Sequence, residues 1–275
     1  MYHVHMNDLH QFHQPGTWDD FSKDYEQLAE PYTRLFALAL AERVALQPGE
    51  RVIDIGCGPG ALSLHMAAAG SHVTAIDHAP IMVQRLLQRA DAAGVRAHLD
   101  AAAMDGQALT FADDSFDVAL SAFGIFLFPD NQAGLGEAVR VVRPGGRIGI
   151  ASWQGDFGAG PSLLLHRCHA ALFPGRPIEP PSRGAASWGD PDVLGRALTD
   201  AGLVDVEVIE HSADWVFPFA DWTDDHAQRL FQMLPSWKAL DADERSRLTQ
   251  AIAASLREDP AVATTALLAT GRKPG

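Results

Sequence analysis

Residues 51–60, Arg-Val-Ile-Asp-Ile-Gly-Cys-Gly-Pro-Gly, constrain the fold of this chain more than any other stretch. Val52, Ile53 and Ile55 are β-branched, which predicts a short buried strand, and glycines at alternate positions follow it. The next residues, 61–69, are typical of a helix that ends at a glycine. A strand, a glycine loop and a helix N-terminus bring backbone N–H groups and a partial positive charge together, so we expect a small-molecule ligand at this loop.

The glycine spacing fits a dinucleotide. Gly56, Gly58 and Ala61 match the pattern G-x-G-x-x-G/A, and Asp77 follows at the distance expected of an acid that binds a ribose. On this interpretation the chain is an NAD(P)-dependent oxidoreductase.

Two residues oppose a diphosphate at the same loop. Asp54 precedes the first glycine by two positions and would bring a carboxylate towards the phosphates, which is unfavourable at short range. Pro59 removes one backbone N–H from the loop that would have to hold the phosphate oxygens. Both features suit a ligand with a cationic amine and a sulfonium.

Further motifs follow the glycine loop in a fixed order. They are Val-Thr-Ala-Ile-Asp at 73–77, Asp-Gly-Gln-Ala-Leu-Thr-Phe-Ala-Asp-Asp-Ser-Phe-Asp at 105–117 and Val-Val-Arg-Pro-Gly-Gly-Arg at 141–147. With residues 51–60 they resemble the class I S-adenosylmethionine-dependent methyltransferases, above all the small-molecule group of the ubiquinone and menaquinone biosynthesis enzymes. The second of these motifs departs from the family's D-A-x-x-L-P-F-x-D-x-S-F-D pattern at Gly106 and Thr110.

The resemblance implies S-adenosylmethionine as the cofactor and S-adenosylhomocysteine as its product. Asp54 would contact the methionine part, Asp77 the ribose hydroxyls and Asp105 the exocyclic amine of adenine, while His78 and Met82 would flank the adenine. The alternatives are a helix or turn cap for Asp77 and Asp105, and plain core packing for Met82. The full expected cofactor-binding set is Asp54, Gly56, Cys57, Gly58, Asp77, His78, Met82, Met104, Asp105, Gly106 and Ser121.

Strand and helix patterns alternate from residue 51 to residue 153, which predicts an α/β fold with a Rossmann-like, doubly wound and mostly parallel sheet. The resemblance implies seven strands with an antiparallel last strand. Long segments that follow parallel strands are usually functional, so we expect helical lid insertions. We expect a single catalytic domain over 1–275, with a helical cover in 1–48, the cofactor-binding core in 49–153 and lid or acceptor segments in 154–189 and 212–260.

Aromatic residues are dense in the lid segments and after the fourth and fifth strands, which favours a small, planar and largely apolar acceptor. The expected substrate-binding residues are Tyr25, Phe123, Phe126, Trp153 and Trp215. We expect methylation of oxygen first, with carbon or nitrogen as alternatives.

No side chain stands out as a catalytic base. A histidine has a suitable pKa for deprotonating an acceptor. His166 and His169 lie three apart on one predicted lid helix and are the catalytic candidates, and His211 ends the predicted sixth strand. We expect no metal, because the Phe-Pro-Asp sequence at 128–130 is common in the metal-free group that the chain resembles.

The composition limits the partners. The net charge of −14 argues against a nucleic-acid backbone, and the sequence has no apolar run of membrane-spanning length. The sequence has no basic leader followed by an apolar core either, so we expect a cytoplasmic protein, and its two cysteines do not make a disulfide framework. We expect a monomer or a homodimer that acts on a small molecule. A non-methylating relative that retains the cofactor site is a further alternative.

Overall fold

The computed structural model describes residues 13–155, 160–176, 188–217, 219 and 221–275. These residues contain one seven-stranded sheet in the order β3-β2-β1-β4-β5-β7-β6. The strands are β1 (Arg51–Ile55), β2 (His72–Asp77), β3 (Leu99–Ala103), β4 (Phe116–Ala122), β5 (Val142–Trp153), β6 (Val204–Val216) and β7 (Ala261–Arg272). Strands β1 to β5 pair in parallel, whereas β7 is antiparallel to both β5 and β6. The mostly parallel sheet with an antiparallel last strand is therefore confirmed.

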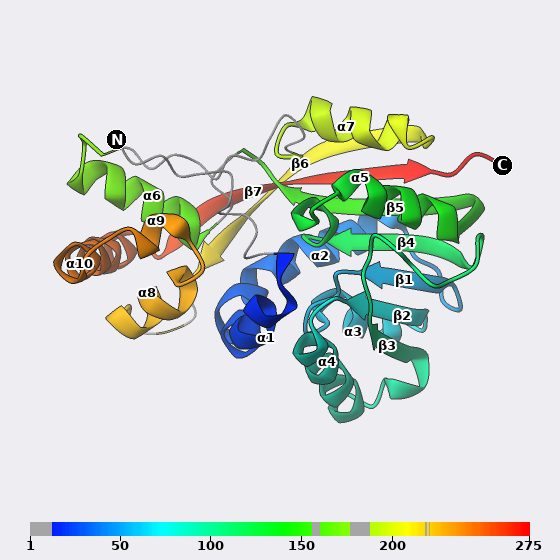
Figure 1. Cartoon of the computed structure of the whole chain (residues 1–275), viewed down its shortest axis with the longest axis horizontal. Coiled ribbons are helices and arrows are strands. Elements are labelled where there is room, and N and C mark those ends of the chain that lie inside the picture. Colours follow the sequence, from blue (N-terminus) through cyan, green and yellow to red (C-terminus); the bar gives the residue numbers. More distant parts are fainter. Residues whose placement is uncertain (1–12, 156–159, 177–187, 218, 220) are drawn as a thin grey trace.

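Helices cover both faces of the sheet (Figure 1). One face carries α2 (Glu30–Val44), α3 (Ala61–Ala68) and α4 (Pro80–Ala92), and the other carries α5 (Asn131–Val141) and α7 (Pro191–Asp200). Because every crossover returns to a parallel strand, the loops after β1, β2, β3, β4 and β5 leave the sheet at the same edge, where ligands bind in open α/β sheets. We call this edge the ligand edge.

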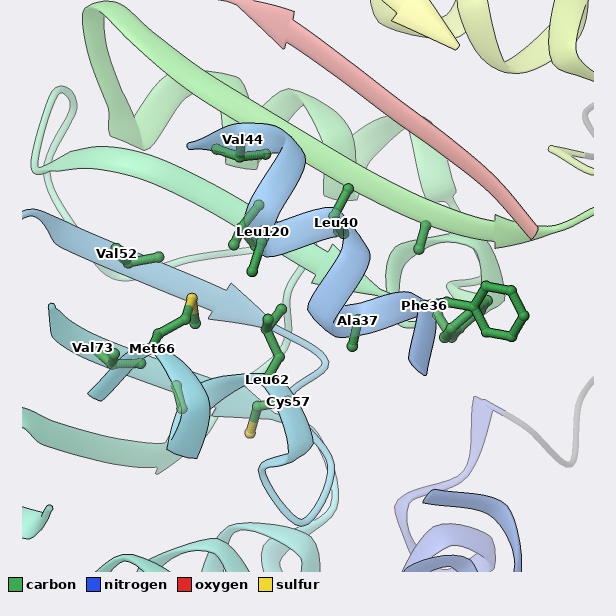
Figure 2. Packing of buried hydrophobic residues seen from close by; sticks show 14 of the residues in the cluster. Phe36, Ala37, Leu40, Val44, Val52, Cys57, Leu62, Met66, Val73 and Leu120 are labelled. Atoms are coloured by element: carbon green, nitrogen blue, oxygen red, sulfur yellow. The ribbon is translucent and has the colours of Figure 1, made fainter. Parts of the chain in front are cut away.

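Helix α2 packs directly on the middle of the sheet. Figure 2 shows Phe36, Leu40 and Val44, four positions apart, on one stripe of this helix. All three side chains are buried in the same hydrophobic cluster as Leu120 of β4. Gly149 in β5 permits this approach, because a Cβ atom there would lie 2.6 Å from Leu120 and 2.8 Å from Val44.

The helical cover at the N-terminus is made of α1 (Pro15–Asp24), a π-helical turn η2 (Tyr25–Ala29) and α2. The sequence predicts a break near Pro31, but the irregularity is the π-turn that precedes it. Pro31 itself lies in the first turn of α2, where a missing N–H leaves no hydrogen bond unmade. Single π-turns are frequent at functional sites.

The lid helices form a separate cluster at one end of the molecule, on the left in Figure 1. They are α6 (Pro161–Leu172), α8 (Asp224–Phe231), α9 (Pro235–Lys238) and α10 (Ala242–Glu258). Their buried side chains pack on one another and on Leu28 of the cover. The predicted capping box of Asp241 and Glu244 opens α10.

The lid segments differ from the expectation in one boundary. Strand β6 continues to Val216 and pairs with β7 along its whole length, so residues 212–216 of the predicted segment 212–260 are strand. Trp215 therefore belongs to the sheet, where its neighbour across β7 is Val262. No helix among the described residues is long and apolar enough to cross a membrane.

Candidate cofactor and acceptor site

The glycine loop after β1 uses most of its backbone N–H groups within the protein. The N–H groups of Gly56 and Cys57 both donate to the Ile76 carbonyl, each at 2.9 Å. The N–H of Gly58 donates to Oδ2 of Asp77 at 2.8 Å. Positive φ angles of 74° at Gly56 and 52° at Gly58 turn the chain back on itself so that these donors converge on the end of β2.

The second half of the loop offers no more donors. Pro59 has no N–H, and the N–H of Gly60 donates to the Cys57 carbonyl at 3.1 Å. A diphosphate at a glycine loop is held by several free backbone N–H groups. Residues 56–60 have already committed theirs, so a diphosphate here would depend on the first turn of α3 for its donors.

Asp54 is buried at the end of β1, with 1% of its surface exposed. Its carboxylate accepts a hydrogen bond of 2.5 Å from the Ser63 hydroxyl, in the first turn of α3. Burial raises the pKa of Asp54 to about 7, which outweighs the lowering effect of Ser63, and the negative charge of Asp77 raises the pKa further. The contact of Asp54 with the methionine part of a cofactor stays a prediction.

Asp77 ends β2 beside the glycine loop and is 8% exposed. Oδ1 accepts the Ala79 N–H at 2.9 Å and Oδ2 accepts the Gly58 N–H. Each carboxylate oxygen can accept more than one hydrogen bond, so both retain capacity for hydroxyl donors. Nδ1 of His78 lies 3.5 Å from Oδ1, and Nε2 of His78 is buried with no hydrogen-bond partner in the described part of the chain.

The residues expected around the adenine lie in different surroundings. Met82 of α4 is buried, with 2% of its surface exposed. Met104 follows β3, is half-buried and donates its N–H to the Asp77 carbonyl at 2.9 Å. Asp105 is exposed, and its Oδ1 accepts hydrogen bonds from the backbone and side chain of Gln107 at 2.9 and 3.0 Å. Asp105 therefore caps a turn in this structure, and its contact with adenine stays a prediction.

Gly106, where the motif departs from the family's alanine, has a packing reason. A Cβ atom at this position would lie 2.6 Å from two ring atoms of Phe128 and 3.0 Å from Ile55. Glycine is thus the residue that lets the loop after β3 pass beneath the Phe128 ring.

Ser121 joins the ends of two strands. Its hydroxyl donates to the Ile55 carbonyl at 2.7 Å and accepts the Ile125 N–H at 3.0 Å. The adjoining backbone is equally close, because a Cβ atom on Gly124 would lie 2.6 Å from the Ile55 carbonyl oxygen and 3.0 Å from the Gly56 Cα. Ser121 thus lies against the glycine loop, and its hydroxyl already donates one hydrogen bond and accepts another.

Six rings from α2, the loop after β4, the end of β5 and the second half of β6 form what we call the aromatic cluster. Its members are Tyr32, Phe36, Phe123, Trp153, His211 and Trp215. The Phe123 and Trp153 rings stack with centroids 3.7 Å apart. Phe123 adopts a φ of 63°, which is rare for an aromatic residue and is found mostly where function constrains the backbone.

Sheet register explains how His211 joins this cluster. Ala266 of β7 lies opposite Trp153 of β5 on one side and opposite His211 of β6 on the other. Residues opposite one another on neighbouring strands project from the same face, so Trp153 and His211 flank a small alanine. The Phe36 ring contacts both, with centroid distances of 5.4 and 5.8 Å.

The five expected substrate-binding residues lie in three different places in the structure. Phe123, Trp153 and Trp215 belong to the aromatic cluster, while Phe126 packs between the hydrophobic clusters on the two faces of the sheet. Tyr25 lies over the glycine loop instead, with a ring atom 3.9 Å from where a Cβ on Gly58 would be.

The two catalytic candidates lie on α6 of the lid. His169 is buried and packs on Phe173 with ring centroids 4.9 Å apart. Burial lowers the pKa of His169, and it lowers the pKa of His166 to about 4. The described residues contain no group of three or more metal-ligating side chains that could hold an ion. The roles of both histidines stay predictions.

The sequence did not predict a role for two residues of this region, Ser63 and Arg89. Ser63 could have been found, because the third position of a helix after a glycine loop faces the end of the preceding strand. Arg89 could not, because α4 carries two arginines at helical spacing and only the fold brings one of them to the Pro59 carbonyl, at 2.8 Å.

Comparison with known proteins agrees with the motifs. Residues 52–146 match the family described as a methyltransferase domain. An uncharacterized protein of Mycobacterium tuberculosis is 39% identical over 172 residues, which cover 60% of this chain and 58% of that protein. The demethylmenaquinone methyltransferase of Corynebacterium glutamicum is 31% identical over 141 residues, which cover 50% of this chain and 58% of that enzyme. The chain thus covers less than two thirds of the length of these relatives.

A solved structure agrees with the fold. The phosphoethanolamine N-methyltransferase 2 of Haemonchus contortus, in complex with S-adenosylhomocysteine, aligns with a TM-score of 0.54 at 18% identity over 87% of this chain and 52% of that one. At this identity the likeness concerns the fold alone. The strand order and this likeness agree on a Rossmann-like methyltransferase fold, and residues 52–146 match the methyltransferase domain.

Proposed function

We propose that the chain transfers a methyl group from S-adenosylmethionine to a small, planar and largely apolar acceptor, with oxygen as the first choice of atom and carbon or nitrogen next. The observation that carries the proposal is the state of the glycine loop. Its N–H groups are committed to the protein, and the group offered to a ligand beside it is the Asp77 carboxylate. A loop whose own N–H groups are committed, beside a carboxylate, suits ribose hydroxyls and a cationic amine and disfavours phosphates.

The residues present fit the cofactor that the fold family implies. Asp77, fixed by two backbone N–H groups, would accept hydrogen bonds from the ribose hydroxyls. Asp54, buried at the end of β1, would face the methionine part. S-adenosylmethionine, when bound, supplies an activated methyl group on its sulfonium. The protein's own task is then to align the acceptor, exclude water and remove a proton where the acceptor carries one.

The aromatic cluster supports a planar apolar acceptor. Its rings pack on one another at the carboxyl ends of β4 and β5, and β4 is the sheet neighbour of β1, where the glycine loop begins. Apolar walls with a few polar groups are typical of small-molecule sites. His211 is the histidine in contact with these rings, so we propose it as the first residue to test as the proton acceptor. His166 and His169 lie on α6 of the lid, and His169 is tested beside His211.

The test measures release of S-adenosylhomocysteine over a panel of phenols and hydroquinones, for the wild type, His211→Gln and His169→Gln. A proton acceptor matters only while the acceptor hydroxyl is protonated, and phenols ionise near pH 10. We therefore expect His211→Gln to lose turnover at pH 7 and to recover it as the pH approaches 10, while His169→Gln behaves as the wild type.

Two results would contradict the proposal. If the wild type binds S-adenosylhomocysteine but turns over no acceptor, the chain is a non-methylating relative that keeps the cofactor site. If His169→Gln shows the pH-dependent loss and His211→Gln does not, the base lies on the lid, as the sequence predicts.

A further inference from the structure

The helical cover, α1 with η2 and α2, is held on the core by ion pairs to one helix. Two arginines of α4 face it, one turn apart. Arg85 donates to Oε2 of Glu26 at 2.8 Å and to the Ser22 hydroxyl at 3.1 Å. Arg89 donates to both carboxylate oxygens of Glu30, each at 2.6 Å. These two ion pairs join the cover to α4, beside the hydrogen bond that the Ile81 N–H donates to Oδ1 of Asp19 at 2.7 Å.

The two attachments differ in burial. The Glu30 side chain is 6% exposed, whereas the Glu26 side chain is 32% exposed. Burial acts to lower the pKa of Arg89, but hydrogen bonding and charge attraction from Glu30 outweigh it and raise that pKa. A bidentate guanidinium–carboxylate pair with one buried partner fixes geometry far more firmly than an exposed pair does.

Arg89 also makes a contact that Arg85 does not. Its Nη1 atom donates to the Pro59 carbonyl at 2.8 Å, in the middle of the glycine loop. Pro59 has no N–H, so its carbonyl is the polar backbone group through which this position of the loop can be fixed. One guanidinium therefore holds the loop and the cover together.

The other end of this connection is the Tyr25 ring. The N–H of Glu30 donates to the Tyr25 carbonyl and closes the π-turn, and the Tyr25 ring lies over Gly58. A displacement of Glu30 would therefore move the ring that lies on the glycine loop. Arg89 therefore fixes the glycine loop directly at Pro59. Through Glu30 and the π-turn it also fixes the Tyr25 ring.

The cover is tied to the lid on its other side. Arg229 of α8 donates to Asp24 at 2.7 Å and to Gln27 at 2.6 Å, and Gln232 donates to Asp24 at 3.3 Å. In Figure 1, α1 accordingly lies between α8 and α4. The cover is therefore bonded to α4 on one side and to α8 on the other.

We propose that Arg89 is a positioning residue of the cofactor site, which joins the glycine loop to the cover and so sets the rate at which bound cofactor leaves. This inference rests on the proposed function, because it takes the ligand of the glycine loop to be S-adenosylmethionine or its product. Arg85 provides the matched control, since it pairs with the same cover from the same helix and makes no hydrogen bond to the loop in the described part of the chain.

The experiment measures the association and dissociation rates of S-adenosylhomocysteine by surface plasmon resonance for the wild type, Arg89→Gln, Arg85→Gln and Glu30→Gln. Thermal unfolding of each variant is recorded in parallel. We expect Arg89→Gln to speed dissociation by about tenfold or more, since it loses charge-assisted bonds on two sides. We expect Arg85→Gln to change the dissociation rate by less than about threefold, because its pair is half-exposed.

Glu30→Gln tests the Arg89–Glu30 pair separately from the Arg89–Pro59 bond. It also provides the test if Arg89→Gln does not fold. It keeps the shape of the side chain and the Arg89 bond to Pro59, so we expect an increase between those of the other two variants. Equal dissociation rates for Arg89→Gln and Arg85→Gln would overturn the inference, because both arginines would then act only as anchors of the cover. An unchanged rate in Glu30→Gln would overturn the link through the π-turn. A wild type that binds no S-adenosylhomocysteine would instead refute the proposed function.

Discussion

Replacing Asp54 by asparagine tests the buried carboxylate at the end of β1. Asparagine keeps the size of the side chain and an oxygen that can accept the hydrogen bond from Ser63, but it cannot ionise. In the wild type, burial raises the pKa of Asp54 from its ordinary value of 3.8 to about 7. The folded protein therefore holds this side chain as a neutral acid at a pH where the unfolded chain has already ionised it.

The direction in which the free energy of unfolding changes with pH follows from the number of protons that the folded and unfolded states bind. Between pH 4 and pH 7 the folded state binds one proton more than the unfolded state at this site, so the stability that it contributes falls as the pH rises. That contribution is fully present below about pH 4 and is lost above about pH 7. Each pH unit in this interval is worth about 1.4 kcal/mol, so the free energy of unfolding loses about 4 kcal/mol through this one group.

The assay is urea unfolding of the wild type and Asp54→Asn at pH 4 and pH 8, with Asp91→Asn as an exposed control on α4. The difference between variant and wild type should move by about 4 kcal/mol in favour of Asp54→Asn from pH 4 to pH 8. Asp91→Asn should keep a constant difference. If Asp54→Asn also keeps a constant difference, Asp54 is ionised in the folded protein and the reasoning from its burial is wrong.

Three further substitutions test neighbouring parts of the site. Asp77→Asn should weaken S-adenosylhomocysteine binding about 10- to 100-fold by calorimetry, because charge-assisted hydrogen bonds are lost. Asp105→Asn should weaken this binding less, and equal losses in the two variants would contradict that order. Gly106→Ala should lower the free energy of unfolding by about 1–3 kcal/mol in urea, because its Cβ would overlap the Phe128 ring, and an unchanged midpoint would refute that contact. Ser121→Ala should cost about 1–3 kcal/mol in the same assay, because it leaves a buried N–H without its acceptor, and a smaller loss would show that water replaces the hydroxyl.

The sequence predicted the parts of the fold that local patterns determine. The β-branched run at 51–55 and the acid that ends β2 each depend on a few adjacent residues and lie where expected. The Asp-Pro start of α7 and the capping box of α10 are local patterns of the same kind, whereas residues 144–146 lie within β5. The antiparallel position of β7 came from the resemblance alone, because no period in residues 261–272 distinguishes the two strand directions.

The site was predictable only in part, because most of its contacts join residues far apart in the chain. Tyr25, expected beside the acceptor, belongs to the π-turn and lies over the glycine loop, and its contact with an acceptor stays a prediction. Trp215 was expected in a lid segment but belongs to β6, because the antiparallel pairing of β6 with β7 extends further than the alternating pattern indicates. The contact of Arg89 with Pro59 joins positions 30 residues apart and has no local signature.

Titration of the wild-type protein with S-adenosylhomocysteine and, separately, with NADH tests the central claim most directly. The acids beside the glycine loop, and the absence of free N–H donors in its described backbone, predict saturable binding of S-adenosylhomocysteine with a dissociation constant on the order of micromolar. They predict no saturable heat with NADH. Tight binding of NADH without binding of S-adenosylhomocysteine would contradict the account.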